Sequence, residues 1–238
     1  IGAVYAVLTL LAYIEWLRAK CFKQNTIYLL SLVFLLLSVL ASQSRAPLIG
    51  LGILTPIAAV FYCRSRSKLL CQFAFIFILS GFAYWSREPI LNLMLERGLS
   101  VRDVIWAEVW AQTLQQNFFW GLGLEKEGRI VLSDGSVFNH AHNAWLDSFY
   151  RTGLVGVLLS SVYIGYLLLR AIKQPQLRPL LLWLVLGIIY SLVDSRGFFW
   201  QIDPKWFCIW LPAGLMGAIL SAQIYQGAES NELEQEKY

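Results

Sequence analysis

The sequence is poor in charge, cysteine and histidine. Of its 238 residues only 14% are charged, four are cysteine and two are histidine. The cysteines form no C-x-x-C pair, and none of them falls in the long polar segment, residues 86–143. This pattern argues against a disulfide scaffold and against a cysteine zinc site. The low charge also argues against a soluble domain, because a soluble chain of this length needs more polar surface.

Apolar residues are abundant instead, and they fall in blocks. They make up 58% of the chain, whose mean hydropathy is +0.57. We interpret the blocks as the spans of an all-α, polytopic integral membrane helical bundle. Because the apolar pattern is already present at Ile1, we expect residues 1–238 to be a single membrane domain from the C-terminal part of a larger protein. The seven predicted spans are residues 1–17, 26–41, 47–63, 69–85, 144–169, 179–193 and 206–222.

Basic residues gather in every second loop between the predicted spans. The positive-inside rule assigns such loops to the cytoplasm. Residues 86–143 then form an outer loop between the fourth and fifth spans, and both histidines lie in it. The net charge of +4 reflects this topology and gives no reason to expect a nucleic-acid partner. The basic clusters are Arg18, Lys20 and Lys23; Arg64, Arg66 and Lys68; and Arg170, Lys173 and Arg178.

The outer loop contains one clear helical pattern. Ser100-Val-Arg-Asp103 fits a capping box, with an acidic residue three positions after the capping serine, and Trp106 and Trp110 follow at i,i+4 spacing. The predicted helix is either an interfacial element with aromatic anchors or a lid over a site at the membrane surface. These two interpretations are compatible. Turns are predicted after the helix at Gly121, Gly123 and Asp134-Gly135.

Both histidines lie where the outer loop meets the fifth span. Imidazole is the side chain whose charge changes nearest to working pH, so a pair of them at a membrane boundary points to chemistry. His142 precedes Asn143 and the start of the span, whereas His140 is expected to face elsewhere. A boundary histidine can also be a satisfied structural group. Two histidines at i,i+2 without suitably spaced carboxylates make a poor metal site, so no metal is predicted.

An acidic residue, Asp147, follows the histidines within the fifth span. Its i,i+4 spacing to Arg151 predicts an ion pair on one face of the helix. The alternative is that Asp147 helps to orient an imidazole. No serine with a nearby histidine and acid stands out as a nucleophile.

Three arginines lie close to the predicted outer boundary. They are Arg45 between the second and third spans, Arg102 in the outer helix, and Arg196 after the sixth span. A guanidinium near hydrocarbon is costly unless it is paired or faces a polar cavity, and its planar fork of donors suits phosphate oxygens. Each arginine is therefore a candidate for binding an anion. The simpler alternatives are a headgroup contact for Arg45, a solvated helix charge for Arg102, and a contact with Asp194 or a headgroup for Arg196.

Three segments together resemble the O-antigen ligase and polymerase superfamily. SQSRAPLIGL, at residues 42–51, resembles the S-x-S-R-G segment of that superfamily. Residues 100–124 resemble its R-x-x-x-W helix followed by N-P-x-x-G-x-G, and residues 140–156, HAHNAWLDSFYRTGLVG, resemble its H-N-x-x-L…G-x-x-G segment. The chain departs from the pattern at Phe118, where proline is usual, and at Arg151, where an acid is common.

The resemblance implies a metal-independent glycosyltransferase without a cofactor, acting on the periplasmic side of a bacterial inner membrane. The donor would be an undecaprenyl-pyrophosphate-linked glycan. A ligase would transfer this glycan to lipid A-core, and a polymerase would transfer it to a second lipid-linked glycan. A non-enzymatic, transporter-like member is a third alternative. With one base and no nucleophile, direct displacement with inversion is the simplest reaction.

The resemblance also implies roles for the residues singled out above. His142 would be the general base, which takes the proton of the acceptor hydroxyl. The secondary candidates are His140, Asn143 and Asp147. Residues expected to bind the pyrophosphate are Arg45, Arg102 and Arg196.

Overall fold

The computed structural model describes residues 1–42, 44–63, 68, 70, 100–124, 130–132, 134–193, 197–198 and 206–235. Within these residues the protein is almost entirely helical, which confirms the predicted all-α membrane bundle. The elements are α1 (Gly2–Arg18), α2 (Phe22–Ala41), α3 (Arg45–Tyr62), α6 (Ser100–Gln116), β1 (Ile130–Val131), β2 (Val137–Phe138), α7 (Ala144–Ile172), η1 (Pro175–Leu177), α8 (Arg178–Val193), the π-helical η2 (Trp206–Trp210) and α9 (Leu211–Gln235).

Six of the predicted spans correspond to described helices, namely α1, α2, α3, α7, α8 and η2 with α9. Several of these helices are longer than the apolar runs that predicted them, because a helix can continue into polar residues at a membrane surface. Thus α2 begins at Phe22 and α9 continues to Gln235. The fourth predicted span, residues 69–85, lies outside the described residues apart from Leu70. The number of spans therefore stays a prediction.

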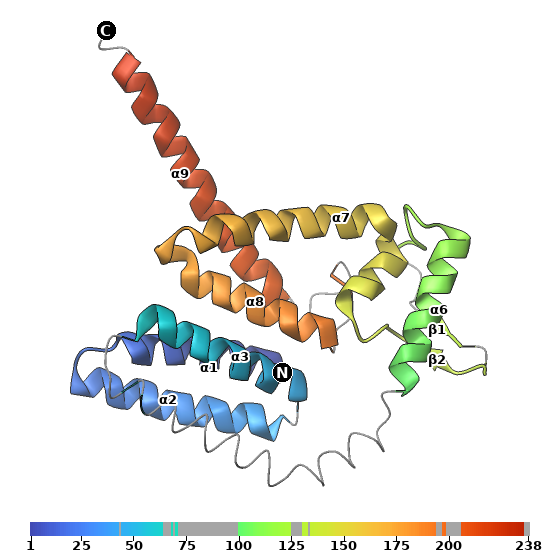
Figure 1. The fold of residues 1–238 in the computed structure, drawn as a ribbon, viewed down its shortest axis with the longest axis horizontal. Helices are drawn as coiled ribbons and strands as arrows, with labels where there is room; N and C mark the ends of the chain where they lie inside the picture. Colours follow the sequence, from blue (N-terminus) through green and yellow to red (C-terminus); the bar gives the residue numbers. More distant parts are fainter. Residues whose placement is uncertain are drawn as a thin grey trace.

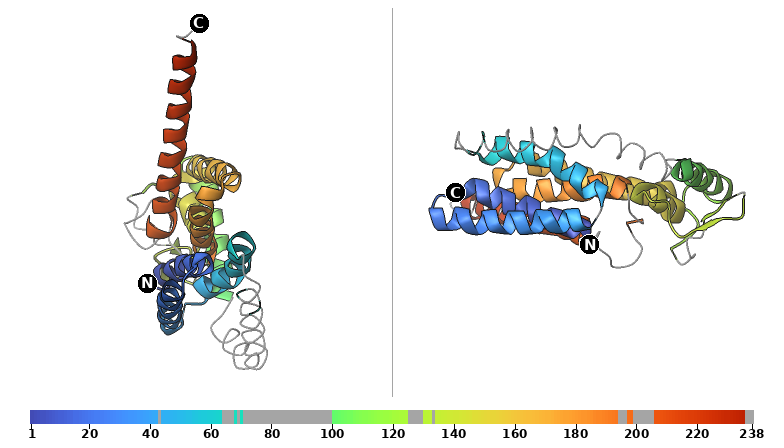
Figure 2. Two further views of the ribbon diagram at one scale, coloured as in Figure 1. Left: turned by 90° about the vertical axis from the view of Figure 1, so that its left-hand side faces the viewer. Right: turned by 90° about the horizontal axis from the view of Figure 1, so that it is seen from below.

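Four helical segments are long and apolar enough to cross a membrane: Phe22–Ala41, Ala144–Ile172, Pro175–Leu192 and Trp206–Gln226. A shorter apolar helix covers Ala46–Tyr62. In Figures 1 and 2, α1, α2, α3, α8 and the long part of α7 run side by side, while the last turns of α9 project away from them. The bundle core is formed by aliphatic side chains of α1, α3 and α8 that are at most 2% exposed, such as Leu10, Ile14, Leu54, Leu184 and Leu186.

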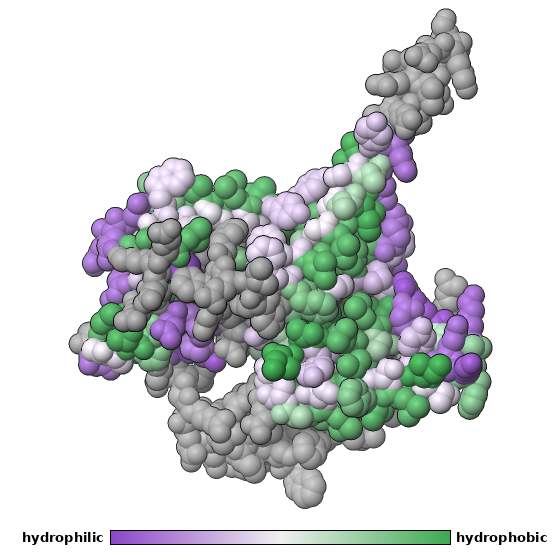
Figure 3. Space-filling model, turned by 180° about the vertical axis from the view of Figure 1, so that it is seen from behind, coloured by the Kyte–Doolittle hydropathy of each residue, from purple (hydrophilic) through white to green (hydrophobic). Residues whose placement is uncertain are grey.

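The outer surface of the bundle is apolar, as expected of a surface that faces lipid. Helix α2 shows this most clearly, because Val39 is its only buried residue. Figure 3 shows apolar side chains spread over the flank of the bundle and polar side chains gathered toward its two ends. Large apolar side chains exposed on α2 include Ile27, Leu30, Val33, Phe34 and Leu37.

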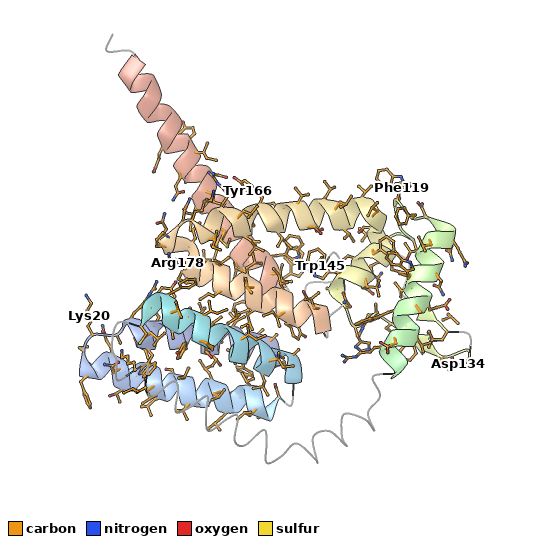
Figure 4. The ribbon with its side chains drawn as sticks, in the orientation of Figure 1. Lys20, Phe119, Asp134, Trp145, Tyr166 and Arg178 are labelled. Carbon is orange, nitrogen blue, oxygen red and sulfur yellow. The ribbon has the colours of Figure 1, made fainter. Side chains whose placement is uncertain are left out.

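One end of the bundle carries described basic residues from each of the three clusters. The guanidinium of Arg18 lies 4.4 Å from the ring centre of Tyr62, and that of Arg178 lies 4.8 Å from the ring centre of Phe61. The ammonium of Lys68 donates to the carbonyl of Trp16 at 2.7 Å. Figure 4 shows Lys20 and Arg178 at this end, and Phe119 and Asp134 at the opposite end. Arg18, Lys68 and Arg178, which the charge pattern assigned to one side of the membrane, therefore lie at the same end of the bundle.

The opposite end carries a small second core, built by α6, the strands and the first turns of α7. Its fully or nearly buried members come from α6, from β1 and the residue after it, from Ala141 and from α7, so the outer helix is packed onto the start of α7. The predicted helix exists as α6, in which Ser100, the predicted capping residue, is already helical. The buried members are Ile105, Val109, Ile130, Leu132, Ala141 and Tyr150.

A short antiparallel hairpin in the outer loop was not predicted. It pairs Ile130 with Phe138 and Val131 with Val137. Strands of two residues are too short to show the alternation of apolar and polar residues by which a strand is predicted. The predicted turn at Asp134-Gly135 closes this hairpin, and Gly135 has a φ of +82°. The hydroxyl and N–H of Ser136 donate to the Asp134 carboxylate at 2.6 and 2.9 Å. These bonds stabilise the charged carboxylate and lower the pKa of Asp134 below its usual value.

Candidate functional site

The two histidines lie in a short turn, residues 140–143, that leads directly into α7. We call this segment the histidine turn. Asn143 is the N-cap of α7, and its side-chain oxygen accepts hydrogen bonds from the N–H groups of Trp145 at 3.0 Å and Leu146 at 3.1 Å. Asparagine is among the best N-cap residues because it satisfies N–H groups that have no partner within the helix. The cap therefore sets where α7 begins relative to the histidines.

His142 has an unusual backbone conformation. Its φ is +55°, and among the described residues it is the only non-glycine residue with a positive φ. A residue held in this left-handed region costs about 1–3 kcal/mol unless its surroundings stabilise the conformation. One stabilising contact is local, since the N–H of His142 donates to Nδ1 of His140 at 3.2 Å. Strain of this kind is found most often at functional sites.

The two imidazole rings lie against each other, which corrects the expectation that His140 faces elsewhere. Their ring centres are 4.0 Å apart and the rings are inclined at 69°. In an extended chain, side chains two residues apart lie on one face but about 7 Å from each other. The left-handed turn at His142 folds the backbone back and brings the rings into contact.

The residue between the histidines, Ala141, is completely buried. Its carbonyl oxygen accepts a hydrogen bond from the indole Nε1 of Trp106 on α6 at 2.8 Å. Its N–H donates to Oδ1 of Asp147 on α7 at 3.3 Å. Two separate helices thus hold the backbone of the histidine turn.

Asp147 is a buried junction between three segments. Its Oδ2 accepts from Nε of Arg151 at 2.9 Å and from the N–H of Gly197 at 2.7 Å, while Oδ1 accepts from Ala141. The side chains of Asp147 and Arg151 are each 1% exposed, so the predicted i,i+4 ion pair is confirmed and is buried. The carboxylate also reaches the histidine turn, through the peptide of Ala141. The two interpretations of Asp147 from the sequence are therefore not exclusive.

The loop that follows α8 is tied to the same part of α7. Besides the bond from Gly197 to Asp147, the N–H of Phe198 donates to Oγ of Ser148 at 2.9 Å. The ring of Phe198 packs edge-on against Trp145, with ring centres 4.7 Å apart. Gly197 and Phe198, the two residues that follow Arg196 in the sequence, are thereby anchored to the first turns of α7.

Helix α7 is broken two residues after Arg151. Gly153 has φ +63° and ψ −164°, which divides the helix into a short first part and a long second part (Figure 1). A break leaves backbone groups without partners inside the helix, and in a membrane each such group must be satisfied by other protein groups. Residues 117–123 do this here, and we call them the plug loop.

The plug loop exchanges backbone hydrogen bonds with both sides of the break. The N–H groups of Leu122 and Gly123 donate to the carbonyls of Tyr150 and Arg151 at 2.8 and 2.9 Å. In return, the N–H groups of Leu154 and Val155 donate to the carbonyls of Phe118 and Phe119 at 2.9 and 3.2 Å. The break in α7 is therefore closed by protein backbone.

Two glycines allow this close crossing. A Cβ atom on Gly121 would overlap the backbone of Arg151, and one on Gly153 would overlap the backbone of Phe119. Both glycines also have positive φ values, 70° and 63°. The sequence predicted Gly121 and Gly123 only as a turn. The sign that could have revealed the break was Gly153 itself, a glycine within an apolar helical run.

The three candidate arginines are described to different degrees. Arg102 is half-buried on α6, one turn before Trp106 and on the same face as the buried Ile105. This face of α6 contacts the histidine turn through Trp106. Arg45 is the first residue of α3, at the end of the bundle that faces α6 (Figure 1), but its side chain lies outside the described part. Arg196 lies entirely outside it.

The two tryptophans of α6 have different surroundings. Trp110 is 51% exposed and packs on Phe149, with ring centres 4.9 Å apart, which suits an aromatic anchor at a membrane surface. Trp106 instead turns inward and donates to Ala141. Trp106 therefore attaches α6 to the histidine turn, a contact that the sequence did not predict because its hydrogen-bond partner lies 35 residues away.

Among the residues that the structure describes, no three histidine, cysteine or carboxylate side chains gather closely enough to hold a metal ion. Within or beside the histidine turn lie two imidazoles, the buried carboxylate of Asp147 and the guanidinium of Arg151.

The chain is similar to known proteins over most of its length. A family model described as O-antigen ligase matches residues 30–161, a stretch that runs from α2 through the histidine turn into α7. The chain is also 27% identical over 233 residues to a curated protein from Pseudomonas aeruginosa named O-antigen ligase. The match covers 96% of this chain and 56% of that protein, so the chain spans about half the length of its relative.

Proposed function

The chain belongs to the O-antigen ligase family, and from this premise we propose that it catalyses an inverting, metal-independent glycosyl transfer. The donor is an undecaprenyl-pyrophosphate-linked glycan, and the acceptor is a sugar of lipid A-core. The observation that carries the proposal is the histidine turn, a pair of imidazoles held in a strained backbone at one end of a membrane bundle. An amphiphilic donor, with its lipid in the bilayer, presents its first sugar at this level.

The proposed location is the bacterial inner membrane, with the site on the periplasmic side. Lys20 and Arg178, which come from two of the basic clusters, lie at the end of the bundle opposite to Asp134 (Figure 4), and the histidine turn is bound to α6 at the Asp134 end. Under the positive-inside rule the basic end is cytoplasmic. The histidine turn then faces the periplasm, where lipid A-core and the lipid-linked glycan meet.

In the proposed reaction, His142 accepts the proton of the acceptor hydroxyl while that oxygen forms a bond to the anomeric carbon of the donor sugar. The bond between this carbon and the pyrophosphate oxygen breaks, and the electron pair leaves with the pyrophosphate. A single displacement of this kind inverts the anomeric centre. General-base catalysis of such a step contributes about 10²–10⁴-fold to the rate.

The departing pyrophosphate gains negative charge, and arginines stabilise it. Arg102 is the best supported of these, because its face of α6 contacts the histidine turn. Arg45 and Arg196 complete the proposed set. Donors aimed at developing charge in a site shielded from water stabilise the transition state more strongly than the ground state.

His140 has a supporting role in this proposal. Its Nδ1 accepts the N–H of His142, so in the neutral ring the hydrogen lies on Nε2. That bond helps to keep His142 in its left-handed conformation. Asn143 contributes as the cap that fixes the start of α7.

A transporter-like function is less well supported. Broken helices do form ion and substrate sites in transporters, where unwound backbone groups are left open to the ligand. Here the plug loop occupies the carbonyls of Tyr150 and Arg151 at the break in α7. The polar groups instead gather at one end of the bundle, which suits an enzyme acting on a lipid-linked substrate.

The deciding experiment compares the lipopolysaccharide of a deletion strain with that of the same strain complemented with the wild-type gene. If the protein is a ligase, the deletion strain should show bare lipid A-core and accumulate lipid-linked polymer, and complementation should reverse both. Lipid A-core that carries a single repeat unit would instead identify a polymerase, with the same chemistry and a different acceptor. Unchanged lipopolysaccharide would contradict both glycosyltransferase assignments.

A further inference from the structure

The peptide groups on both sides of Ala141 are held by side chains from outside the histidine turn. Trp106 on α6 donates to the carbonyl, and Asp147 on α7 accepts the N–H. Because Ala141 separates the two histidines, these bonds fix the backbone from which both rings project. Ala141 is fully buried, so water does not compete for either bond.

These bonds matter because the conformation of His142 is not one it would adopt in isolation. A histidine prefers negative φ, and a change of φ away from +55° would swing the ring away from His140. The bond from the His142 N–H to His140 is local, because it joins two half-exposed residues of the turn itself. The two bonds to Ala141 attach the turn to α6 and α7 at the residue between the histidines, in addition to the Asn143 cap.

Trp106 and Asp147 also connect the histidine turn to segments next to two of the candidate arginines. Trp106 lies one turn after Arg102 on α6, so the indole bond sets the distance between this helix and His142. Asp147 also accepts the N–H of Gly197, which follows Arg196 directly in the chain. A base and its anion-binding partners must be held within about 1 Å of the reactive geometry for full rate.

We propose that Trp106 and Asp147 are positioning residues, which clamp the Ala141 peptide and thereby orient His142 relative to the arginines. This inference rests on the proposed function, in which His142 is the base. Neither residue touches the reacting atoms in this proposal; both act through the backbone of the histidine turn. The indole N–H of Trp106 is the more testable of the two, because it can be removed without disturbing a buried charge.

The test compares Trp106→Phe with Trp106→His in native membranes, using the lipid-linked glycan and lipid A-core of the source bacterium as substrates. Phenylalanine keeps more of the packing but has no donor. Histidine loses packing, yet its Nε2–H occupies nearly the same ring position as the indole N–H. The matched control is Trp110→Phe, since Trp110 lies one turn further on α6 and packs through its ring on Phe149.

At matched protein levels, we expect Trp106→Phe to lower kcat roughly 10- to 100-fold with little change in KM for the donor. Trp106→His should recover part of the loss, and Trp110→Phe should be close to wild type. If packing alone mattered, the order would reverse and phenylalanine would be the better replacement. That order, or a wild-type kcat in Trp106→Phe, would overturn the proposal.

A double-variant cycle separates positioning from a general structural effect. In a His142→Ala background there is no base to orient, so adding Trp106→Phe should lower the residual single-turnover rate no further. Independent, multiplicative losses would refute the clamp. Failure of the wild-type protein to transfer glycan at all would refute the proposed function instead, so the two failures are distinguishable.

Discussion

The backbone N–H of Gly197 donates to Oδ2 of Asp147 at 2.7 Å, although the two residues are 50 positions apart in the sequence. The same oxygen accepts from Nε of Arg151, and the other carboxylate oxygen accepts from Ala141. One buried carboxylate thus joins the histidine turn, the first part of α7 and the loop after α8. A change at Asp147 should therefore be felt in all three segments.

Loss of the proposed base is the first prediction. His142→Ala should lower single-turnover transfer by about 10²–10⁴-fold while binding of the lipid-linked donor persists, because the base acts in the chemical step. His140→Ala should be milder, since His140 in this proposal supports the conformation of His142 and does not take the proton. If His140→Ala is the more damaging of the two, the role of base belongs to His140. Near-normal rates in both would exclude the histidine turn from the chemistry.

Charge-conserving changes test the arginines. Arg102→Lys and Arg45→Lys keep the positive charge but lose the planar fork that binds two phosphate oxygens at once. Each variant should show strongly reduced transfer at a normal protein level, measured with the lipid-linked donor in membranes. A suitable control is Arg170→Lys, because Arg170 lies in the last turn of α7, at the basic end of the bundle. Wild-type transfer in both variants would mean that neither arginine binds phosphate in this way.

Variants of the buried pair Asp147–Arg151 distinguish an effect on stability from an effect on glycan transfer. Asp147→Leu alone leaves the Arg151 guanidinium buried without its carboxylate, and removing one partner of such a pair typically costs about 3–5 kcal/mol. The double variant Asp147→Leu with Arg151→Met should recover most of the thermal stability, measured by unfolding in detergent. Glycan transfer should not recover, because the N–H groups of Ala141 and Gly197 still lack their acceptor. Full recovery of transfer would limit Asp147 to a structural role.

The crossing of the plug loop and α7 should be intolerant of side chains. Gly121→Ala and Gly153→Ala each place a Cβ against backbone atoms. We expect each to destabilise the protein by about 3 kcal/mol, which lowers the melting temperature by roughly 5–10 °C. Gly165→Ala is the control within the same helix, because a Cβ there meets nothing within 4 Å. Equal melting temperatures for all three variants would contradict the crossing.

Transfer should continue without divalent metal. The prediction follows from the lack of a suitable ligand pattern in the sequence and from arginines as the proposed partners of the pyrophosphate. The measurement is transfer by purified protein in excess chelator. A loss of activity that Mg²⁺, Mn²⁺ or Zn²⁺ restores would show that a metal shares this role.

The sequence by itself was sufficient for the features that depend on neighbouring residues. Apolar runs predicted the helices, because the length and hydropathy of a segment decide whether it can lie in lipid. The i,i+4 spacing of Asp147 and Arg151 predicted their pair, since residues at this spacing share a helix face. Asn143 before an apolar run is likewise a local signal, and it is the N-cap of α7.

Only the tertiary structure decided how distant segments meet. The bond from Trp106 to Ala141 and the crossing of Gly121 with Gly153 join segments more than 30 residues apart. No spacing rule encodes such contacts, because they depend on how helices pack and on which backbone groups a broken helix leaves to be satisfied. The expectation that His140 faces away failed for a related reason. His142 has a left-handed φ in a turn whose middle residue is bound by two helices, and the sequence of the turn alone does not specify this conformation.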